Sequence, residues 1–121
     1  KIKKPNVSGQ FYTSNANKLS SEIDKYFDAA KIKPYDNQIG IIISPHAGYI
    51  YSGWVAAYGF KAASKNKYNT VIVMAPSHYY SFDGASVWEE GVFETPLGQI
   101  EVDSDFSKKL LLKSLNRAVS S

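Results

Sequence analysis

The sequence predicts an α/β fold in which parallel strands form a sheet flanked by helices. Residues 40–43 and 70–75 are apolar, β-branched runs without polar alternation, and this pattern indicates strands buried on both faces. Residues 54–65 between them are typical of a helix, because their small and apolar side chains suit packing on a sheet. Two strands joined by such a helix are expected to form a right-handed parallel crossover unit.

The residues before this unit predict one further helix. Asn15 or Asn17 is a suitable N-cap for a helix that ends near Ala30. Its apolar face is expected to carry Leu19, Ile23, Tyr26 and Phe27. The aromatic segment 9–12 is expected to pack against the body of the domain, and residues 31–38 form a polar connection.

The pattern of apolar and turn residues in the sequence changes after residue 78. Residues 85–88, 92–94 and 98–102 are short stretches separated by turn residues, and they predict an antiparallel excursion at the sheet edge. Asp103 or Ser104 then caps a last helix that extends to about Leu115.

Length and composition limit the classes of protein to which the chain can belong. A chain of 121 residues, with 44% hydrophobic and 21% charged residues, is expected to form a single α/β unit over residues 1–121. No apolar run is long enough to span a bilayer, and the basic amino-terminal residues are not followed by the apolar segment of a signal peptide. Scattered lysines and a net charge of +3 argue against a nucleic-acid surface. We therefore expect a cytoplasmic protein that binds neither nucleic acid nor membrane, and the absence of cysteine is compatible with this compartment.

The chain's only two histidines follow the two predicted strands. His46 comes after Pro45, and His78 comes after Pro76 and Ser77. Ligands of open α/β sheets bind beyond the carboxyl ends of the strands, where neighbouring strands are about 4.8 Å apart. Both imidazoles are therefore expected to face a shared metal site or acid–base site. Imidazole suits zinc, copper and iron, and a complete site needs a third ligand.

Other polar groups near these strand ends are weaker candidates. The flanking tyrosines are expected to line a pocket wall or donate a proton; they are Tyr49, Tyr51, Tyr79 and Tyr80, and we assign the catalytic role to Tyr51. The nearby carboxylates are expected to be surface or capping groups; they are Asp83, Glu89, Glu90, Glu94, Glu101 and Asp103. The sequence contains no nucleophile-elbow serine and no phosphate-binding loop.

Several motifs of the chain resemble the signature of the Memo family, whose bacterial and archaeal members are called AmmeMemoRadiSam system protein B. The most specific are Pro-His-Ala-Gly-Tyr-Ile-Tyr-Ser-Gly at residues 45–53 and Ala-Pro-Ser-His at residues 75–78. Gly-Gln-Phe-Tyr at residues 9–12, Glu-Thr-Pro-Leu-Gly at 94–98 and Val-Asp at 102–103 agree in order. The resemblance therefore extends over nearly the whole chain.

The resemblance implies a fold similar to class III extradiol dioxygenases, which are non-haem iron enzymes. It also implies that His46 and His78 are metal ligands, with iron as the expected divalent metal and copper or zinc as alternatives. Members of the family are longer than this chain, so these residues are expected to be the amino-terminal part of a longer Memo-like domain, without the third ligand. The family's name further implies a functional link to a radical SAM protein.

These considerations give three hypotheses about function. The leading one is a Memo-like metal-binding protein that acts as a non-haem-iron-dependent oxidoreductase on a small molecule. The alternative is a non-catalytic binding or scaffold module that uses the same pocket for a peptide or a small ligand. A third is metal-assisted hydrolysis with Tyr51 or Tyr79 near the reacting group. On their own, these residues are expected to leave an apolar sheet edge uncovered and so to form oligomers.

Overall fold

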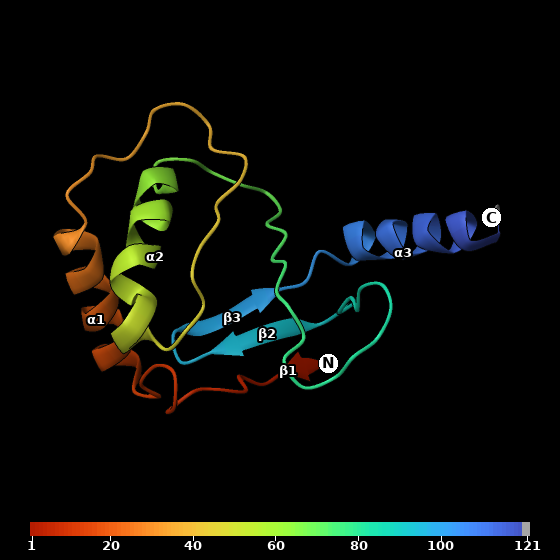
Figure 1. Ribbon diagram of the computed structural model, residues 1–121, viewed down its shortest axis with the longest axis horizontal. Coiled ribbons are helices and arrows are strands. Elements are labelled where there is room, and N and C mark those ends of the chain that lie inside the picture. The colour runs from red at the N-terminus through yellow and green to blue at the C-terminus, as the bar shows by residue number, and fades with distance from the viewer. Residues whose placement is uncertain (120–121) are drawn as a thin grey trace. The chain divides into compact units, whose positions relative to one another are not determined.

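The computed structural model describes the backbone of residues 1–119 and the side chains of residues 1–113. In chain order the elements are β1 (Ile2–Lys3), α1 (Ala16–Ala29), α2 (Tyr49–Ala63), β2 (Val92–Thr95), β3 (Gly98–Glu101) and α3 (Ser104–Val119) (Figure 1). The α/β class is therefore confirmed. The chain divides into a helical unit, residues 5–68 with 95–98, and a sheet unit, residues 1–4 and 69–94 with the residues from 99 onward.

The helical unit is built on the packing of α1 against α2. The Asn15 side chain accepts a hydrogen bond of 2.9 Å from the backbone N–H of Lys18, which confirms Asn15 as the N-cap of α1. Leu19 is the buried residue of α1, and α2 buries mainly small residues. A Cβ atom added at Gly53 would lie 2.8 Å from the Tyr26 ring, so the absence of a side chain at Gly53 permits the close approach of the two helices.

The carboxyl end of α1 is closed by a lysine from α2. Lys61 Nζ donates to the carbonyl oxygens of Phe27 and Ala30, and both distances are 2.7 Å. The last carbonyl groups of a helix have no intrahelical partner and carry partial negative charge, so an ammonium group is a favourable partner for them.

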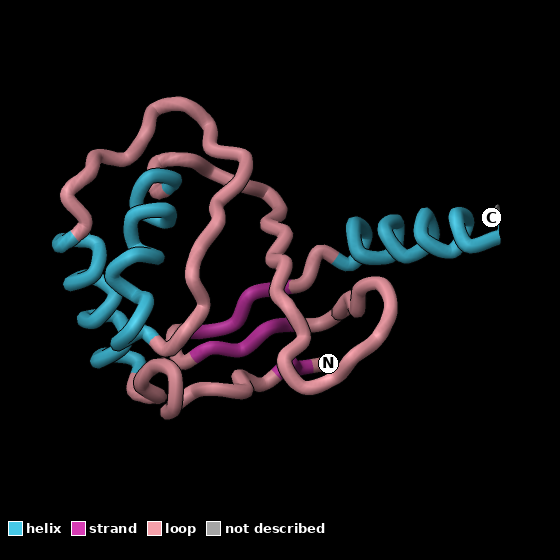
Figure 2. The backbone as a smooth tube through the Cα atoms, in the orientation of Figure 1, coloured by secondary structure: helices cyan, strands magenta, loops and turns pink. Residues whose placement is uncertain are grey.

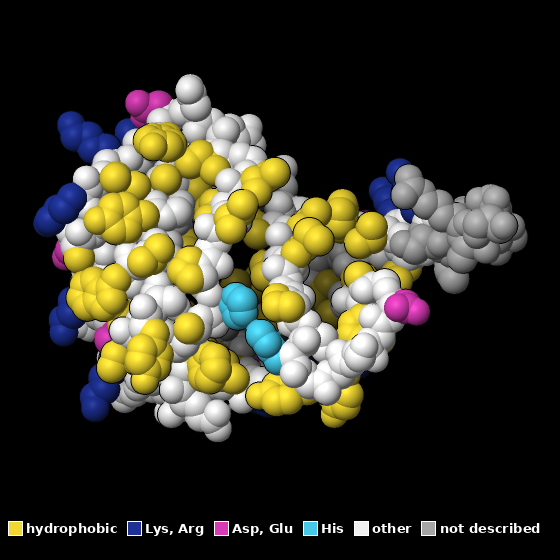
Figure 3. All heavy atoms as spheres, viewed as in Figure 1, with side chains coloured by type: hydrophobic (Ala, Val, Ile, Leu, Met, Phe, Trp, Pro, Cys, Tyr) yellow, Lys and Arg dark blue, Asp and Glu magenta, His cyan; other side chains and the backbone are white. Residues whose placement is uncertain are grey.

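Residues 40–43 do not form the expected buried strand. They lie in a long connection between α1 and α2 (Figure 2). Ile41 and Ile43 are 84% and 96% exposed. The space-filling view shows many hydrophobic side chains at the surface (Figure 3). Ile42 alone of these isoleucines faces α2, where its Cγ2 atom would lie 2.7 Å from a Cβ added at Gly59. A doubly buried strand needs a paired strand and a second layer, and the described residues supply neither to this segment.

The connection is nevertheless anchored at its start within the helical unit. The backbone N–H of Ile39 donates to Asn66 Oδ1 at 2.8 Å, and the Tyr68 hydroxyl donates to the carbonyl oxygen of Ile39 at 2.6 Å. The segment before His46 is thus held by side-chain contacts in place of a strand ladder.

Residues 70–75 also differ from the expected strand. Val73 and Met74 are 85% and 92% exposed, and the whole connection from α2 to β2 is irregular (Figure 2). The predicted parallel crossover unit is therefore wrong for this structure, because neither of its two strands has a partner among the described residues. Within the sheet unit, a hydrogen bond between the side chains of Thr70 and Asp103 anchors the start of the segment.

The sheet of the protein is formed by other residues. β1 pairs in parallel with β2, with Ile2 opposite Val92 and Lys3 opposite Phe93, and the strand order is β1-β2-β3. β2 and β3 are joined by a tight turn, in which Thr95 Oγ1 donates to the carbonyl oxygen of Gly98 at 3.2 Å. This hairpin confirms the excursion expected at residues 92–94 and 98–102, whereas residues 85–88 form no strand.

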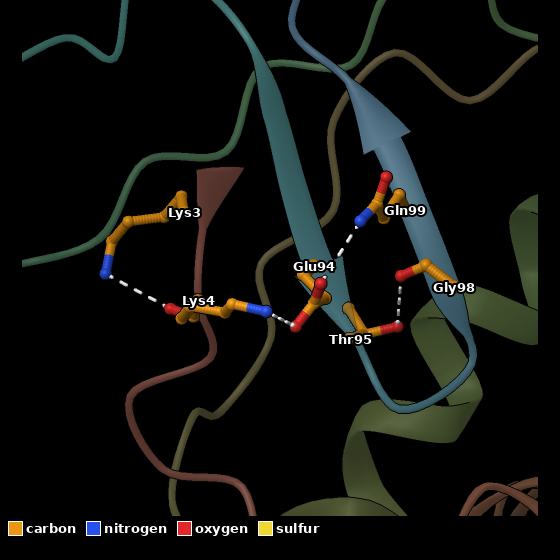
Figure 4. A network of polar contacts seen from close by, with 6 residues as sticks. All are labelled: Lys3, Lys4, Glu94, Thr95, Gly98 and Gln99. Carbon is orange, nitrogen blue, oxygen red and sulfur yellow. Dashed lines mark hydrogen bonds and ion pairs between the residues drawn. The ribbon is translucent and has the colours of Figure 1, made fainter. Parts of the chain in front are cut away.

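The Glu94 carboxylate in β2 contacts Lys4, which follows β1, and Gln99 in β3 (Figure 4). Glu94 in β2 accepts hydrogen bonds from Lys4 Nζ at 2.7 Å and from Gln99 Nε2 at 3.1 Å. These two donors, with Lys4 the stronger influence, hold the pKa of the Glu94 carboxyl below its usual range.

The last helix begins at an aspartate cap. Asp103 Oδ1 accepts a hydrogen bond of 2.9 Å from the backbone N–H of Phe106, which confirms Asp103 as the N-cap of α3. The helix extends to Val119, beyond the expected end near Leu115. No helix in the described part of the chain is long and apolar enough to cross a membrane.

Candidate functional site

His46 lies in the helical unit, on an exposed loop directly before α2. The backbone around it is fixed by the serine residues on either side. Ser52, which is buried, donates from Oγ to the carbonyl oxygen of Ala47 at 2.9 Å, and Ser44 Oγ donates to the carbonyl oxygen of Pro45 at 3.2 Å. The imidazole therefore projects from a loop whose backbone is held to the first turn of α2.

The amino terminus of α2 gives this loop its second attachment. Gly48 is the N-cap residue, and the backbone N–H of Tyr49 donates to the carbonyl oxygen of Phe11 at 2.8 Å. A Cβ atom at Gly48 would lie 3.5 Å from the Phe11 backbone, so the loop and the 9–12 segment are in close contact. The expected packing of that aromatic segment against the body of the domain is confirmed, and α2 begins at Tyr49, earlier than the expected Trp54.

His78 lies in the sheet unit, on the irregular connection that leads to β2. The Ser77 hydroxyl donates to the carbonyl oxygen of Tyr80 at 2.6 Å and accepts from the backbone N–H of Tyr80 at 3.2 Å. These two hydrogen bonds close a small turn around His78, and the His78 side chain is exposed.

The tyrosines near the histidines differ strongly in their exposure to solvent. Tyr51, the predicted catalytic tyrosine, is 82% exposed on the first turn of α2, and Tyr79 and Tyr80 are 91% and 80% exposed. Tyr49 is half-buried, and burial, together with the neighbouring Tyr12 and Tyr26, raises the pKa of its phenol above the usual range.

The two histidines belong to different units, and each is described within its own unit. Their assignment as partners in one site remains a prediction. Within the part of the chain that the structure describes, no three His, Cys, Asp or Glu side chains form a group able to hold a metal ion. Of the carboxylates considered, Glu94 binds Lys4 and Gln99, and Asp103 caps α3. The described donor set therefore does not complete a metal centre.

The helical unit contains an aromatic groove that the sequence did not predict. The groove has a volume of about 580 Å³ and lies between residues 9–14, α1 and the start of α2. Helical spacing assigned Tyr26 to the apolar face of its helix, but it gave no sign that Tyr49 and Trp54 would meet that ring. The three rings line one groove only because of the way in which α1 packs on α2.

Comparisons with known proteins agree with the motifs. The family model described as "Memo-like protein" matches residues 3–118. The chain is 37% identical over 114 residues to a MEMO1 family protein of Nitrosopumilus maritimus, an alignment that covers 90% of this chain and 41% of the relative. It is 40% identical over 112 residues to a MEMO1 family protein of Thermotoga maritima, covering 84% of this chain and 40% of the relative.

A third relative, a MEMO1 family protein of Pyrobaculum arsenaticum, is 36% identical over 121 residues, covering 92% of this chain and 42% of the relative. The chain thus spans about two-fifths of the length of these relatives. No solved structure matches the chain significantly.

Proposed function

The chain belongs to the Memo-like protein family, and we propose that it is the amino-terminal part of a metal-binding Memo-like protein in which His46 and His78 provide two imidazole ligands. The proposal rests on one shared structural feature of the two histidines. Each is an exposed side chain on a loop whose backbone is hydrogen-bonded to a nearby serine hydroxyl, Ser52 for His46 and Ser77 for His78. Fixing the backbone lowers the entropy lost when a side chain binds a ligand.

The chemistry of the donors supports a divalent transition metal. Two neutral imidazoles suit iron, copper and zinc, and we propose iron because of the family resemblance. The third ligand would come from outside the described residues, since these residues offer no complete group of donors. A bound iron would supply redox chemistry for the oxidation of a small molecule, and the exposed Tyr51 hydroxyl, on the first turn of α2 directly after the His46 loop, is the proposed proton donor.

A second candidate function is binding without turnover. The exposed Tyr51 ring beside the His46 loop favours it, because tyrosine side chains are enriched at binding interfaces. In this case the same residues would form part of a pocket for a peptide or a small ligand.

Metal content tests the proposal. The protein is purified without chelator, beside His46→Ala, His78→Ala and the double variant, and its metals are quantified by mass spectrometry. A near-stoichiometric metal content in the parent protein that is lost in each single variant supports a shared site. Metal that persists in the double variant contradicts it.

Oxygen consumption then separates the two candidate functions. A metal-loaded protein that consumes oxygen with a candidate substrate, and loses this activity in Tyr51→Phe, supports an oxidoreductase. A loaded protein that binds ligands but consumes no oxygen supports the binding module.

A further inference from the structure

The irregular connection between α2 and β2 contains the one Asp-Gly sequence of the chain, at Asp83 and Gly84. Both residues are exposed, and Gly84 has a φ of +85°, in the left-handed region. A Cβ atom added at Gly84 would meet no other atom within 4 Å, so no neighbouring group packs beside this peptide unit. Within the described residues, the backbone N–H of Gly84 donates to no other group. The Asp83 carboxyl group and the amide that follows it are therefore open to each other and to solvent.

This pair of groups undergoes a known type of cyclisation. The backbone nitrogen of Gly84 attacks Cγ of Asp83 and forms a carbon–nitrogen bond, while the amide proton and the hydroxyl of the protonated carboxyl group leave as water. Water then adds to one of the two carbonyl carbons of the resulting succinimide ring. Addition at the main-chain carbonyl opens the ring to isoaspartate, whereas addition at Cγ restores aspartate. Glycine favours the first step, because it has no side chain to hinder the attacking nitrogen.

Three of the other aspartates lie in helices. Asp24 and Asp28 belong to α1, and Asp105 belongs to α3. Backbone N–H groups within a helix donate to carbonyl oxygens of the preceding turn, so the nitrogens after Asp24 and Asp28 are held away from their carboxyl groups. The nitrogen after Asp105 is that of Phe106, whose N–H donates to Asp103 Oδ1 at 2.9 Å. The fold therefore disfavours cyclisation at these three positions.

The last two aspartates have polar partners. The Asp103 carboxylate accepts from the Thr70 hydroxyl as well as from the first turn of α3. Asp36 is exposed, but it pairs with Lys65 at 2.7 Å, and the residue that follows it, Asn37, carries a side chain. Asp36 is thus the best comparison within the chain, since it shares the exposure of Asp83 but not its glycine.

We propose that Asp83 is a modification site at which aspartate converts spontaneously to isoaspartate, and that the folded chain confines this reaction to Asp83. The product keeps its carboxylate but lengthens the main chain by one methylene group, in the connection that carries His78 and leads to β2. An isoaspartate in an exposed loop is a substrate for isoaspartyl methyltransferases, which transfer a methyl group from S-adenosylmethionine to its carboxylate. This inference does not depend on metal binding at His46 or His78.

Ageing of the purified protein provides the test. The protein is incubated for weeks at neutral pH in water labelled with heavy oxygen and is then compared with fresh protein by peptide mapping and mass spectrometry. We expect labelled oxygen at Asp83 and a loss of cleavage before residue 83 by a protease that recognises aspartate but not isoaspartate. An isoaspartyl methyltransferase should transfer methyl groups to the aged protein and not to the fresh protein.

Matched variants locate the reaction. Asp83→Glu keeps the charge but would have to form a larger and less favourable ring, so we expect the methyl label to be lost. Asp36→Glu is the control and is expected to retain the label. In denaturant, the rate at Asp83 is expected to stay within about twofold of its value in the folded protein, because an exposed loop has few contacts to lose. The rate at Asp103 should rise, because unfolding removes its hydrogen bonds.

Four results would overturn the inference. The first is the absence of isoaspartate at Asp83 under conditions in which a synthetic peptide of residues 79–88 forms it. The second is equal modification of Asp36 and Asp83, which would remove the role of Gly84. The third is a methyl label that persists in Asp83→Glu. The fourth is a rate at Asp83 that rises as steeply on unfolding as the rate at Asp103, which would mean that the fold protects this loop.

Discussion

The buried hydroxyl of Ser52 donates a hydrogen bond of 2.9 Å to the carbonyl oxygen of Ala47, the residue that follows His46. Ser52 Oγ also lies 3.5 Å from the carbonyl oxygen of Gly48, the N-cap of α2. A side chain on the helix thus helps to hold the loop that presents the histidine.

The first prediction concerns this hydroxyl. Ser52→Ala leaves the carbonyl group of Ala47 without its partner, and we expect the free energy of unfolding to fall by about 1–2 kcal/mol in chemical denaturation. We also expect the His46 imidazole resonances to shift in NMR spectra, because the loop backbone relaxes. Ser64→Ala is the control, since Ser64 makes a similar bond of 2.8 Å to the Lys61 carbonyl at an exposed position. Equal destabilisation by both variants would argue against a special role for Ser52.

The second prediction concerns the closure of α1 by Lys61. Lys61→Met keeps most of the aliphatic chain but removes the two hydrogen bonds to the Phe27 and Ala30 carbonyls. We expect the free energy of unfolding to fall by about 1–3 kcal/mol, because hydrogen bonds from a charged donor are lost. Lys65→Met removes only an exposed ion pair with Asp36, so we expect a much smaller change in the free energy of unfolding than for Lys61→Met. The prediction fails if the two variants unfold alike.

The third prediction distinguishes two helical glycines. Alanine normally stabilises a helix interior by about 1 kcal/mol relative to glycine. At Gly53 the new Cβ would lie 2.8 Å from the Tyr26 ring, which Trp54 and Tyr49 hold in place, so we expect Gly53→Ala to destabilise the protein by about 1–3 kcal/mol.

Gly59→Ala is the matched comparison. The nearest atom to its new Cβ is Ile42 Cγ2, at 2.7 Å, and Ile42 lies in an irregular connection, not in a helix or strand. We expect a neutral or stabilising effect in the same denaturation experiment. A stabilised Gly53→Ala variant would show that α1 and α2 approach less closely than described.

The fourth prediction concerns pH. The hydrogen bond with Thr70, followed by that from Phe106 N–H, lowers the pKa of Asp103 below its usual range. Because the folded-state pKa lies below the unfolded one, this carboxylate stabilises the fold fully above the unfolded value of about 3.9 and loses its contribution as the pH falls through the folded pKa. We expect Asp103→Asn to reduce the acid dependence of stability in this range.

Thermal unfolding measured across acidic pH checks this expectation. Asp105→Asn, a change of the same kind in the first turn of α3, is the control. An acid dependence that is unchanged in Asp103→Asn would contradict the assigned cap.

The fifth prediction concerns association. The exposed β-branched residues of segments 40–43 and 70–75 have no strand partner among the described residues, so we expect copies of this chain to associate in a concentration-dependent manner. Light scattering should show the mass falling toward the monomer in the double variant Ile41→Lys, Ile43→Lys. A monomer with cooperative unfolding in the parent would contradict the prediction.

Elements that depend on neighbouring residues could be predicted from the local sequence. The sequence predicted Asn15 or Asn17 as the cap of α1 and Asp103 or Ser104 as the cap of α3, and the structure selects Asn15 and Asp103. The Thr95–Gly98 turn predicted the hairpin. Each is a cap or turn whose hydrogen bonds join residues a few positions apart, so the local sequence contains the information. The family motifs at residues 45–53 and 75–78 could also be recognised from the local sequence, and the comparisons confirmed the family.

Features that need distant partners depend on how the chain packs in three dimensions. Apolar, β-branched runs at 40–43 and 70–75 suggested buried strands, but strand formation requires pairing, and the described residues provide no pairing partner there. The aromatic groove likewise exists because Gly53 lets α1 and α2 approach until Tyr26, Tyr49 and Trp54 meet. The periodicity of the sequence identifies which side chains lie on one face of a helix or strand. Tertiary packing determines what that face contacts.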